Sequence, residues 1–308
     1  MEFSEYLQHL RDPASHLSVA DLEHLHDLTS EETKALNSAW PQIDPERRQQ
    51  VVCQLIELAE DNVDLDFDSV LFTALDDPEA TVRAAAVRGL WEYKGRDLIG
   101  RLLRLLEKDE EPEVRAEAAL ALGRFVLMFE LGDLRERHFQ KIEEGLRRTL
   151  DDELENDEVQ ARALEAIGAC GQPWVGQSIL QAYESGVPRL KTSAMHAMGR
   201  SCEPRWLHLL IEEVNSKDAE MRYEAATALG SLADRRAVSH LAPLLDDPDL
   251  EVQEAAIAAL GQIGGTDAKS LLRPLLQAPS ASVQQAAAAA LAEASFVEDH
   301  LSADYDLL

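Results

Sequence analysis

Four arginines recur along the chain at intervals of 36 to 38 residues, at Arg88, Arg124, Arg162 and Arg200. A guanidinium group holds its N–H donors in a rigid fork that binds carboxylates and phosphates through paired hydrogen bonds. Trp91 and Tyr223 are aromatic residues of the kind that anchor protein interfaces. If these side chains share one surface, they predict a binding site for an acidic or phosphorylated peptide.

A structural alternative assigns the same arginines to ion pairs with glutamates on neighbouring helices. The glutamates at suitable positions are Glu92, Glu117, Glu165 and Glu224. Exposed pairs of this kind contribute only about 0–1 kcal/mol each to stability. The sequence is compatible with both interpretations. The candidate binding surface comprises Arg88, Trp91, Glu92, Arg124, Arg162, Glu165, His196, Arg200 and Tyr223.

The motifs that mark common catalytic and metal sites are absent. The sequence contains no glycine-rich phosphate loop, no GxSxG, no HExxH and no zinc-site spacing of Cys and His. Cys53, Cys170 and Cys202 lie far apart and predict reduced thiols. His24 and His26 lie two residues apart, so they project from different sides of a helix, which disfavours a shared metal. We therefore expect no catalytic residue, no cofactor and no metal.

The chain is strongly acidic, with 58 Asp and Glu against 29 Lys and Arg and a formal net charge of −29. Such a charge repels phosphate backbones, so we expect no nucleic-acid partner. The acidity fits either a basic protein partner or a general adaptation for solubility or salt. Residues 66–150 are closest to balance, with 14 basic and 18 acidic residues.

The N-terminal segment MEFSEYLQHLRD lacks a basic region followed by an apolar run, so it does not resemble a signal peptide. No apolar stretch approaches the roughly 20 residues that a membrane-spanning helix needs. We expect a soluble cytoplasmic protein without membrane insertion.

The candidate residues lie within an internal repeat. Its anchor positions are Val82, Val114, Val159, Leu190, Met221, Val252 and Val283. The last five anchors are 31 residues apart, whereas about 14 extra residues separate Val114 from Val159. Alanine four positions after each anchor and an apolar residue eight positions after it fall on one helical face. Glycine then follows in five units, where we expect the helix to end.

A second apolar helix precedes each anchor and ends in an acidic or polar turn such as DDPD. Proline suits the first turn of a helix but cannot continue one, so each unit of about 31 residues predicts two antiparallel helices. Such pairs bury their apolar faces only by stacking on neighbours. Positions two, three, six and ten past each anchor are expected to face solvent. The arginine one position after the anchor (Arg83, Arg115, Arg222) is expected to bridge to the Asp of an adjacent turn between helices.

The pattern DDPDxxVR/QxxAxxALG resembles HEAT-like repeats of the short variety first associated with phycobilin lyases, over about residues 66–295. The resemblance implies an all-α fold, an α-solenoid of about seven to eight helical hairpins, with the second helices lining a concave surface. HEAT-like deoxyhypusine hydroxylases hold iron through His-Glu dipeptides, and none of the nine histidines here precedes Glu. Because this fold serves many functions, the resemblance does not select one.

We expect an N-terminal helical extension or cap over residues 1–30 and a repeat solenoid over 31–295, with an insertion at about 130–150. An acidic tail is expected over 296–308. The favoured function is a non-enzymatic scaffold or adaptor that binds a protein or peptide along the concave face. Two alternatives remain: an enzyme or enzyme subunit of the bilin-lyase type acting on a tetrapyrrole-carrying protein, and a structural subunit of a stable complex.

Overall fold

The computed structural model describes residues 2–12, 15, 18–62 and 64–305 of the chain. Within these ranges the backbone forms helices joined by turns, and it contains no strand. The chain divides into two compact units, Met1–Ala163 and Leu164–Leu308. The predicted all-α fold built from paired helices is confirmed.

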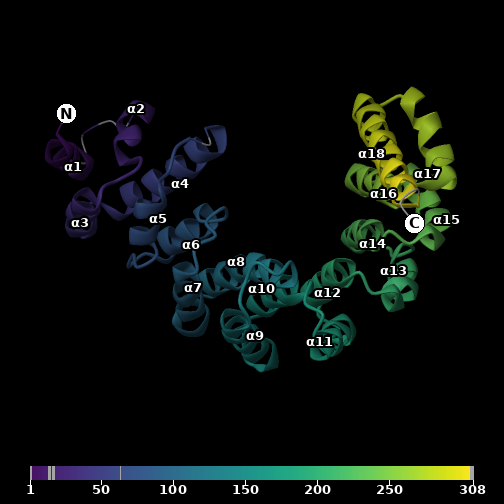
Figure 1. Ribbon diagram of the computed structural model, residues 1–308, viewed down its shortest axis with the longest axis horizontal. Helices are drawn as coiled ribbons and strands as arrows, with labels where there is room; N and C mark the ends of the chain where they lie inside the picture. The colour runs from purple at the N-terminus through teal and green to yellow at the C-terminus, as the bar shows by residue number, and fades with distance from the viewer. Residues whose placement is uncertain (1, 13–14, 16–17, 63, 306–308) are drawn as a thin grey trace. The chain divides into compact units, whose positions relative to one another are not determined.

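The first unit begins with three short elements, which are α1 (Phe3–Arg11), α2 (Val19–Leu22) and the 3-10 turn η1 (Glu23–Leu25). A series of antiparallel helix pairs follows them. The pairs are α3 (Ser30–Ala39) with α4 (Pro45–Asp61), α5 (Asp68–Ala74) with α6 (Ala80–Gly89), and α7 (Asp97–Lys108) with α8 (Pro112–Glu130). The 3-10 turn η2 (Trp40–Gln42) links α3 to α4, and α9 (Glu136–Asp151) and α10 (Asp157–Ile167) follow α8. We call the first helix of each pair its A helix and the second its B helix. Figure 1 shows that A helices lie beside A helices and B helices beside B helices, as in α4, α6 and α8.

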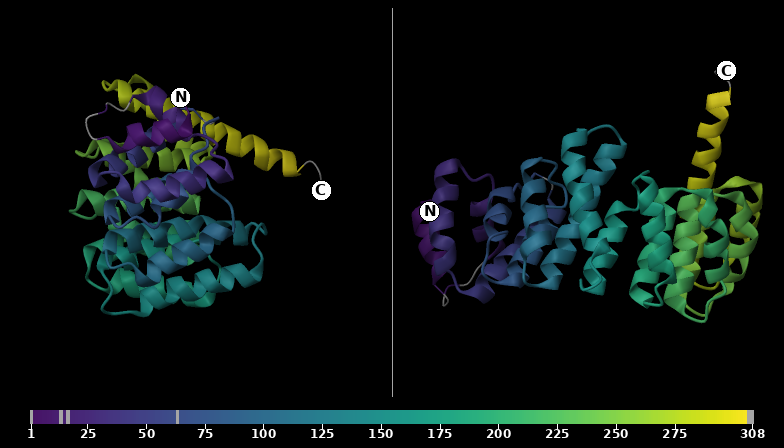
Figure 2. Two further views of the ribbon diagram at one scale, coloured as in Figure 1. Left: turned by 90° about the vertical axis from the view of Figure 1, so that its left-hand side faces the viewer. Right: turned by 90° about the horizontal axis from the view of Figure 1, so that it is seen from below.

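The second unit repeats this arrangement. Its pairs are α11 (Pro173–Glu184) with α12 (Pro188–Ser201), α13 (Leu207–Glu213) with α14 (Ala219–Leu232), α15 (Val238–Leu241) with α16 (Leu250–Ile263), and α17 (Gly265–Leu272) with α18 (Ala281–Tyr305). Four 3-10 turns extend or precede the A helices: η3 (Pro204–Trp206), η4 (Arg235–Ala237), η5 (Ala242–Asp246) and η6 (Arg273–Gln277). The B helices α12, α14, α16 and α18 pack in sequence, and α18 extends past the other helices of its unit (Figure 2).

The B helices of the second unit approach so closely that glycine meets the backbone of the next helix. A Cβ atom added to Gly168, Gly199, Gly230 or Gly261 would lie 2.8–2.9 Å from the Cα atom of the alanine 29 residues further on. Real Cβ atoms do not tolerate such distances, so each contact requires glycine on one side and a small residue on the other. The alanine and glycine positions of the repeat are therefore the contact line between helices.

The expectation that glycine ends the helix holds for Gly168, which directly follows α10, but it is wrong for the other four glycines of the repeat, including Gly123 inside α8. Gly199, Gly230 and Gly261 lie inside α12, α14 and α16, each of which continues for two more residues. Two of the helices end instead at Cys202 and Ala233, which adopt the left-handed conformation with φ near +50°. The glycines are required for close packing and not for a change of chain direction.

The predicted bridges to the Asp of an adjacent turn are confirmed for Arg83 and Arg222, and Arg115 forms the equivalent bridge to a Glu. Arg83 pairs with Asp109 at 2.7 Å, Arg115 with Glu155 at 2.6 Å and Arg222 with Asp247 at 2.7 Å. Each arginine also donates a hydrogen bond to a carbonyl group of the turn before its own helix. One side chain thereby joins two successive turns.

The most buried member of this series was missed by the sequence pattern. Arg48 in α4 pairs with Asp77 at 2.7 Å, and the indole N–H of Trp40 donates to the same carboxylate at 2.6 Å. The DPERRQQV segment carries an arginine at the expected distance from its turn, but Arg47 stands where the other repeats have their apolar anchor. That substitution hid the register of the first repeat.

At the N-terminus, α1 and α2 pack against α3 and α4 and bury Tyr6, Leu10, Leu22 and Leu25 completely. His26 Nδ1 accepts a hydrogen bond from the backbone N–H of Asp66 at 2.8 Å, so this histidine serves a structural contact. Residues 13, 14, 16 and 17 of the expected N-terminal cap lie outside the described residues.

The extra residues of the expected insertion at 130–150 divide between the last turns of α8 and a lengthened α9, which is the A helix that precedes α10. At the C-terminus, the expected tail over 296–308 continues α18 as far as Tyr305, and residues 306–308 lie outside the described residues.

Replacing Gly230 with alanine is expected to lower the free energy of unfolding by about 1–3 kcal/mol. The new methyl group would lie 2.8 Å from the Cα atom of Ala259, so α14 and α16 would have to separate. Urea denaturation followed by circular dichroism measures the change. The matched control is Gly100→Ala on the exposed side of α7, where no atom lies within 4 Å; it is expected to gain about 0.5–1 kcal/mol. Equal effects in the two variants would contradict the close-packing account.

Arg222→Gln is expected to cost about 1–3 kcal/mol at neutral pH, because the buried carboxylate of Asp247 loses two donated hydrogen bonds. Hydrogen bonding from Arg222 holds the pKa of Asp247 below its usual range. This contribution is present above a pH of about 4 and is lost as the pH falls through the lowered pKa, so the cost of the substitution should shrink in acid. Denaturation at several pH values tests this. Arg236→Gln, which breaks an exposed pair with Asp234, is the control and should change little.

Candidate functional site

Among the candidate residues of the first unit, Arg88 is exposed on α6 and bound to the adjacent B helix. Its guanidinium lies 2.8 Å from Glu117 and 3.6 Å from Glu113, both on α8. Arg162 forms a pair with Glu158 one turn earlier in α10, at 2.8 Å. The contact of Arg88 with Glu117 matches the ion-pair alternative, whereas the pair of Arg162 with Glu158 lies within one helix, and Glu158 is not one of the glutamates expected on a neighbouring helix.

Arg124 lies mostly inside the protein. Its guanidinium donates to the carbonyl oxygen of Leu90 and lies over the Phe125 ring, with 5.0 Å between the guanidinium carbon and the ring centroid. The buried Nε and Nη2 atoms have no hydrogen-bond partner among the described residues. Burial lowers the pKa of Arg124 to about 10. This side chain holds α8 against the end of α6.

In the second unit, Glu165 is held within the protein by the Ser193 hydroxyl at 2.6 Å and by Arg189 at 3.0 Å. His196 is half-buried on α12, and Arg200 is exposed on the same helix. The expectation that positions two and three past the anchor face solvent is wrong here, because Thr192 and Ser193 are buried. The close approach of neighbouring B helices covers these positions.

Exposed apolar side chains lie in a row along α8, the B helix that the insertion lengthens. Leu120, Leu127 and Leu131 follow one another along one side of α8, at spacings of seven and four residues. Leu131 is 70% exposed and Leu127 is 41% exposed, and Trp91, at the end of the adjacent α6, is 60% exposed. We call Trp91, Leu120, Leu127 and Leu131 the apolar row. The repeat pattern did not predict Leu127 and Leu131, because they lie in the added turns of α8.

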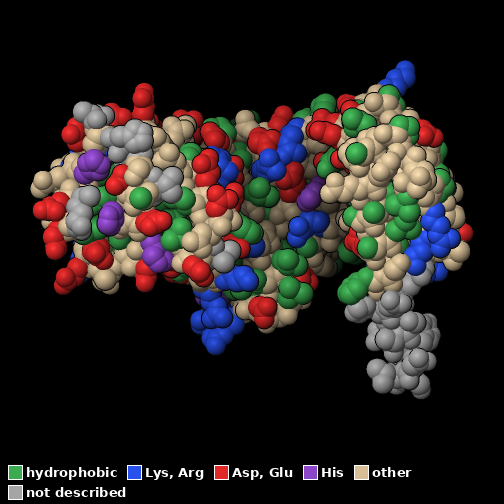
Figure 3. All heavy atoms as spheres, turned by 90° about the horizontal axis from the view of Figure 1, so that it is seen from above, with side chains coloured by type: hydrophobic (Ala, Val, Ile, Leu, Met, Phe, Trp, Pro, Cys, Tyr) green, Lys and Arg blue, Asp and Glu red, His purple; other side chains and the backbone are tan. Residues whose placement is uncertain are grey.

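A shallow hollow lies between α14 and α16 in the second unit, with a volume of about 500 Å³. Its lining combines the half-exposed ring of Tyr223 with the side chains of Thr227, Glu251, Glu254, Ala255, Ala258, Ala259 and Gln262. Beside Tyr223, burial and the charges of Glu165 and Glu220 raise the pKa of Glu224 to about 7. The Tyr223 ring therefore lies beside a surface of alanine side chains, and acidic side chains line the same hollow. Figure 3 shows one face of the molecule, on which acidic side chains surround smaller groups of basic and apolar ones.

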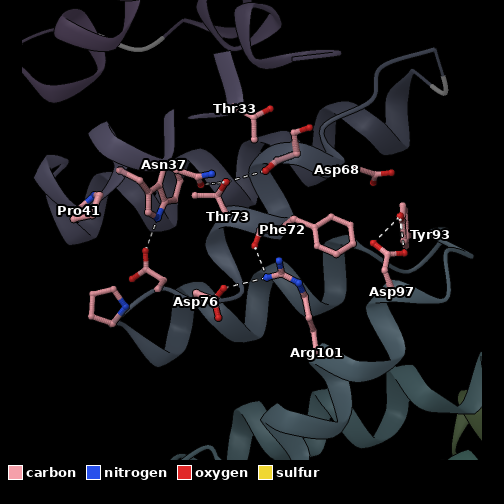
Figure 4. A pocket seen from close by; sticks show the side chains of 14 residues that line it. Thr33, Asn37, Pro41, Asp68, Phe72, Thr73, Asp76, Tyr93, Asp97 and Arg101 are labelled. Carbon is pink, nitrogen blue, oxygen red and sulfur yellow. Dashed lines mark hydrogen bonds and ion pairs between the residues drawn. The ribbon is translucent and has the colours of Figure 1, made fainter. Parts of the chain in front are cut away.

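A pocket of about 640 Å³ lies among the A helices of the first unit (Figure 4). Phe72 and Tyr93 meet edge to face with ring centroids 4.9 Å apart, and Arg101 lies over Phe72 while pairing with Asp76 at 3.0 Å. Burial, together with the charge of Asp66, raises the pKa of Asp68 to about 6. The pocket is thus a mixed aromatic and acidic site.

Within the described ranges, no group of three or more His, Cys, Asp or Glu side chains is placed to hold a metal ion. Among the same residues, none of the helices has the length and apolar character required to cross a membrane.

The sequence matches HEAT repeats over residues 69–156 and 207–292, which together make up more than half of the chain. The chain belongs to the HEAT repeat family. The two matched segments contain the pairs α5–α6, α7–α8, α13–α14 and α15–α16, so the family assignment rests on helix pairs seen in both units. A search of curated proteins finds no match to the sequence.

Several solved structures share the HEAT repeat architecture. In the complex of CpcE and CpcF of phycocyanin lyase from Nostoc sp. PCC7120, the matching chain is 20% identical with a TM-score of 0.56, and the alignment covers 85% of this chain and 96% of that one. Human deoxyhypusine hydroxylase in complex with glycerol is 18% identical with a TM-score of 0.37, covering 96% of both chains. YibA of E. coli is 17% identical with a TM-score of 0.47, covering 79% and 95%. At these identities the likeness shows the fold alone.

Asp68→Asn is expected to stabilise the protein at pH 8 relative to its effect at pH 4. Because the folded pKa of Asp68 is raised to about 6, the stability from its protonated form is present in acid and is lost as the pH rises through about 6. The asparagine amide of the variant does not ionise, so the variant does not lose this stability as the pH rises. Thermal midpoints of variant and wild type at the two pH values test the difference. The exposed Asp64→Asn variant is the control, and an equal pH dependence for both substitutions would contradict the assignment.

Proposed function

We propose that this HEAT repeat protein is a non-enzymatic scaffold that binds a protein or peptide segment on its B-helix faces. HEAT repeats are a fold suited to protein interaction, and the family assignment supports this broad class of function. The observation that carries the proposal is the apolar row on α8 and α6, because exposed apolar side chains in one group mark interaction sites.

The apolar row has the spacing of a helical contact surface. Leucines seven and four residues apart along α8 match the pattern by which helices present anchors to a bound segment. Arg88 and its glutamate partners on α8 form a polar margin in the same unit. Interfaces combine an apolar centre with a polar rim in this way. Arg88, Trp91 and Glu92 of the candidate surface therefore belong to the rim and the centre of this proposed site.

The second unit offers its own contact surface around Tyr223. The ring is 39% exposed above the hollow between α14 and α16, and tyrosine combines a large apolar area with a polar end. His196 and Arg200 on α12 lie on the same series of B helices. By contrast, Arg162 and Glu165 are engaged by neighbouring side chains. We assign them, together with the buried Arg124, to holding the helices in place.

The fold shared with the phycocyanin lyase chain does not favour the enzymatic alternative over the scaffold, because its identity to this chain is only 20%. A lyase-type function predicts that the purified protein carries or transfers a chromophore, which ultraviolet–visible absorption detects directly. A structural subunit of a complex would use the same B-helix surfaces for a permanent partner.

Leu127→Glu combined with Leu131→Glu is expected to remove a partner that wild type retains during affinity purification from its native host. Charge at these positions opposes burial of the apolar row, whereas both side chains already face solvent, so the fold should be unaffected. The matched control is Leu154→Glu, since Leu154 is an isolated leucine of the same unit with 95% exposure. Mass spectrometry identifies the retained proteins.

A partner recovered with wild type and Leu154→Glu but lost from the double variant supports the proposal. Binding of that partner to purified proteins should weaken at least about tenfold in the double variant. Recovery of the same partners with all three proteins would contradict the role of the apolar row. Absence of any partner in every sample would contradict the scaffold function itself.

A further inference from the structure

The first unit contains a group of cations that its own acidic residues leave unpaired. They are Arg96, Arg135, Arg137 and Lys141, and His138 lies among them. All four cationic side chains are exposed, and within the described residues none forms an ion pair. We call these four residues and His138 the basic cluster.

The packing of α7 and α9 brings the basic cluster together. A Cβ atom on Gly145 of α9 would lie 2.7 Å from the Leu103 side chain of α7, and Arg148 pairs with Glu107 at 2.8 Å. The two helices therefore run parallel, with an offset of 41 to 42 residues. The same offset places Arg96, at the start of α7, beside His138, in the first turns of α9.

The positive charges of the cluster act on the His138 imidazole. Desolvation and the positive charges of Arg137, Arg96, Lys141 and Arg135 all lower the pKa of His138. The neutral imidazole accepts a hydrogen bond at Nε2 from the Arg137 guanidinium at 3.2 Å. The cluster is thus a region of local positive charge on a strongly acidic protein.

The carboxylates next to the cluster in the sequence accept hydrogen bonds from uncharged side chains, and within the described ranges they form no ion pair with its cations. Asp97 accepts a hydrogen bond from the Tyr93 hydroxyl at 3.0 Å, and Glu136 accepts one from the Gln140 amide at 3.3 Å. Arg96 and Arg135 also occupy the N-caps of α7 and α9, where the helix dipole favours negative charge. Because positive charge at an N-cap opposes the helix dipole, stabilising α7 and α9 does not explain why Arg96 and Arg135 occupy these positions.

Most other cations on the same helices are paired. Arg101 and Arg104 share Asp76, and Arg148 contacts Glu107 and Glu144. Among the described residues Lys108 also has no ion pair, but it lies at the opposite end of α7 from the basic cluster. Because neighbouring like charges in the cluster repel one another, an external negative partner would relieve that repulsion.

We propose that the basic cluster is a docking surface for a carboxylate-rich segment of a partner protein. Arginine forks from two helices match closely spaced Asp and Glu side chains, and charge complementarity selects such a segment. The surface lies at the starts of the A helices and consists of residues other than those of the apolar row, so the proposal does not depend on the proposed function of that row.

A protein segment fits this surface better than a nucleic acid. The cluster is small, and a phosphate backbone extending beyond it would meet the acidic residues that give the chain its net charge of −29. A short acidic segment requires only the cluster itself. Salt screens the rest of the protein beyond about 10 Å at 0.1 M, so the local cations determine binding.

The test measures fluorescence anisotropy of a labelled deca-glutamate peptide titrated with the full-length protein. Wild type is expected to bind saturably at low salt and more weakly as NaCl is raised. Arg96→Glu combined with Lys141→Glu should weaken binding at least about tenfold. The matched control, Lys217→Glu with Arg273→Glu, makes the same change in net charge at two exposed cations of the second unit and should bind like wild type. Circular dichroism verifies the fold of each variant, and Arg96→Gln with Lys141→Gln should give an intermediate affinity.

Equal weakening in the cluster and control variants would overturn the proposal, because the effect would then reflect net charge alone. Absence of saturable binding by wild type at low salt would also overturn it. A deca-thymidine oligonucleotide serves as the competing probe. Tighter binding of the oligonucleotide than of the peptide, lost in the cluster variant, would overturn the assignment to a protein segment.

Discussion

Backbone contact between successive B helices is the constraint on which the rest of the second unit depends. Four times in that unit, a glycine of one B helix faces the Cα atom of an alanine on the next helix. A pair of helices with so many small residues buries little apolar area alone, so stability comes from stacking on the next pair. The spacing of 29 residues between each glycine and its alanine then fixes the register from one pair to the next.

The arginines one position after the anchors fix the same register in the loops that the glycine contacts fix in the helices. Arg83, Arg115 and Arg222 each join a carboxylate of the following turn to carbonyl groups of their own turn. These side chains are largely buried, and their bidentate geometry makes them more selective than exposed pairs. Glycine contacts and arginine bridges therefore specify the same stacking at two levels, the helix surface and the connecting turn.

Much of this architecture could be predicted from the sequence, because residues that recur at the same position of each repeat form equivalent contacts in successive helix pairs. The helix pairs, the anchors and the arginine bridges all follow from residues that recur at a fixed spacing. The role of the glycines could not be inferred, since a glycine near a helix end suits a turn and a close contact equally well. Only the continuation of α12, α14 and α16 past Gly199, Gly230 and Gly261 separates the two explanations.

The candidate site was less predictable for the same reason. Arg88 and Arg124 lie six and ten positions past their anchors, where we expected both to face solvent. Arg88 is exposed and paired with Glu117, whereas Arg124 is mostly buried against Leu90. The repeat position of a residue determines on which side of the helix it lies, but not whether a neighbouring loop covers its side chain. Side-chain burial there depends on the length of the following helix, which the repeat pattern does not encode.

The insertion between the second and third anchors departs from the repeat, and both proposed binding surfaces lie at it. Its extra residues lengthen α8, which exposes Leu127 and Leu131, and they lengthen α9 at its start, where Arg135, Arg137 and Lys141 lie. Residues that obey the repeat are needed to hold neighbouring helices together and have little freedom to change. Residues of the insertion have no equivalent in the other pairs, so packing does not dictate their types. Exposed leucines and unpaired cations concentrated in such a segment therefore require an explanation outside the fold, and binding to a partner provides one.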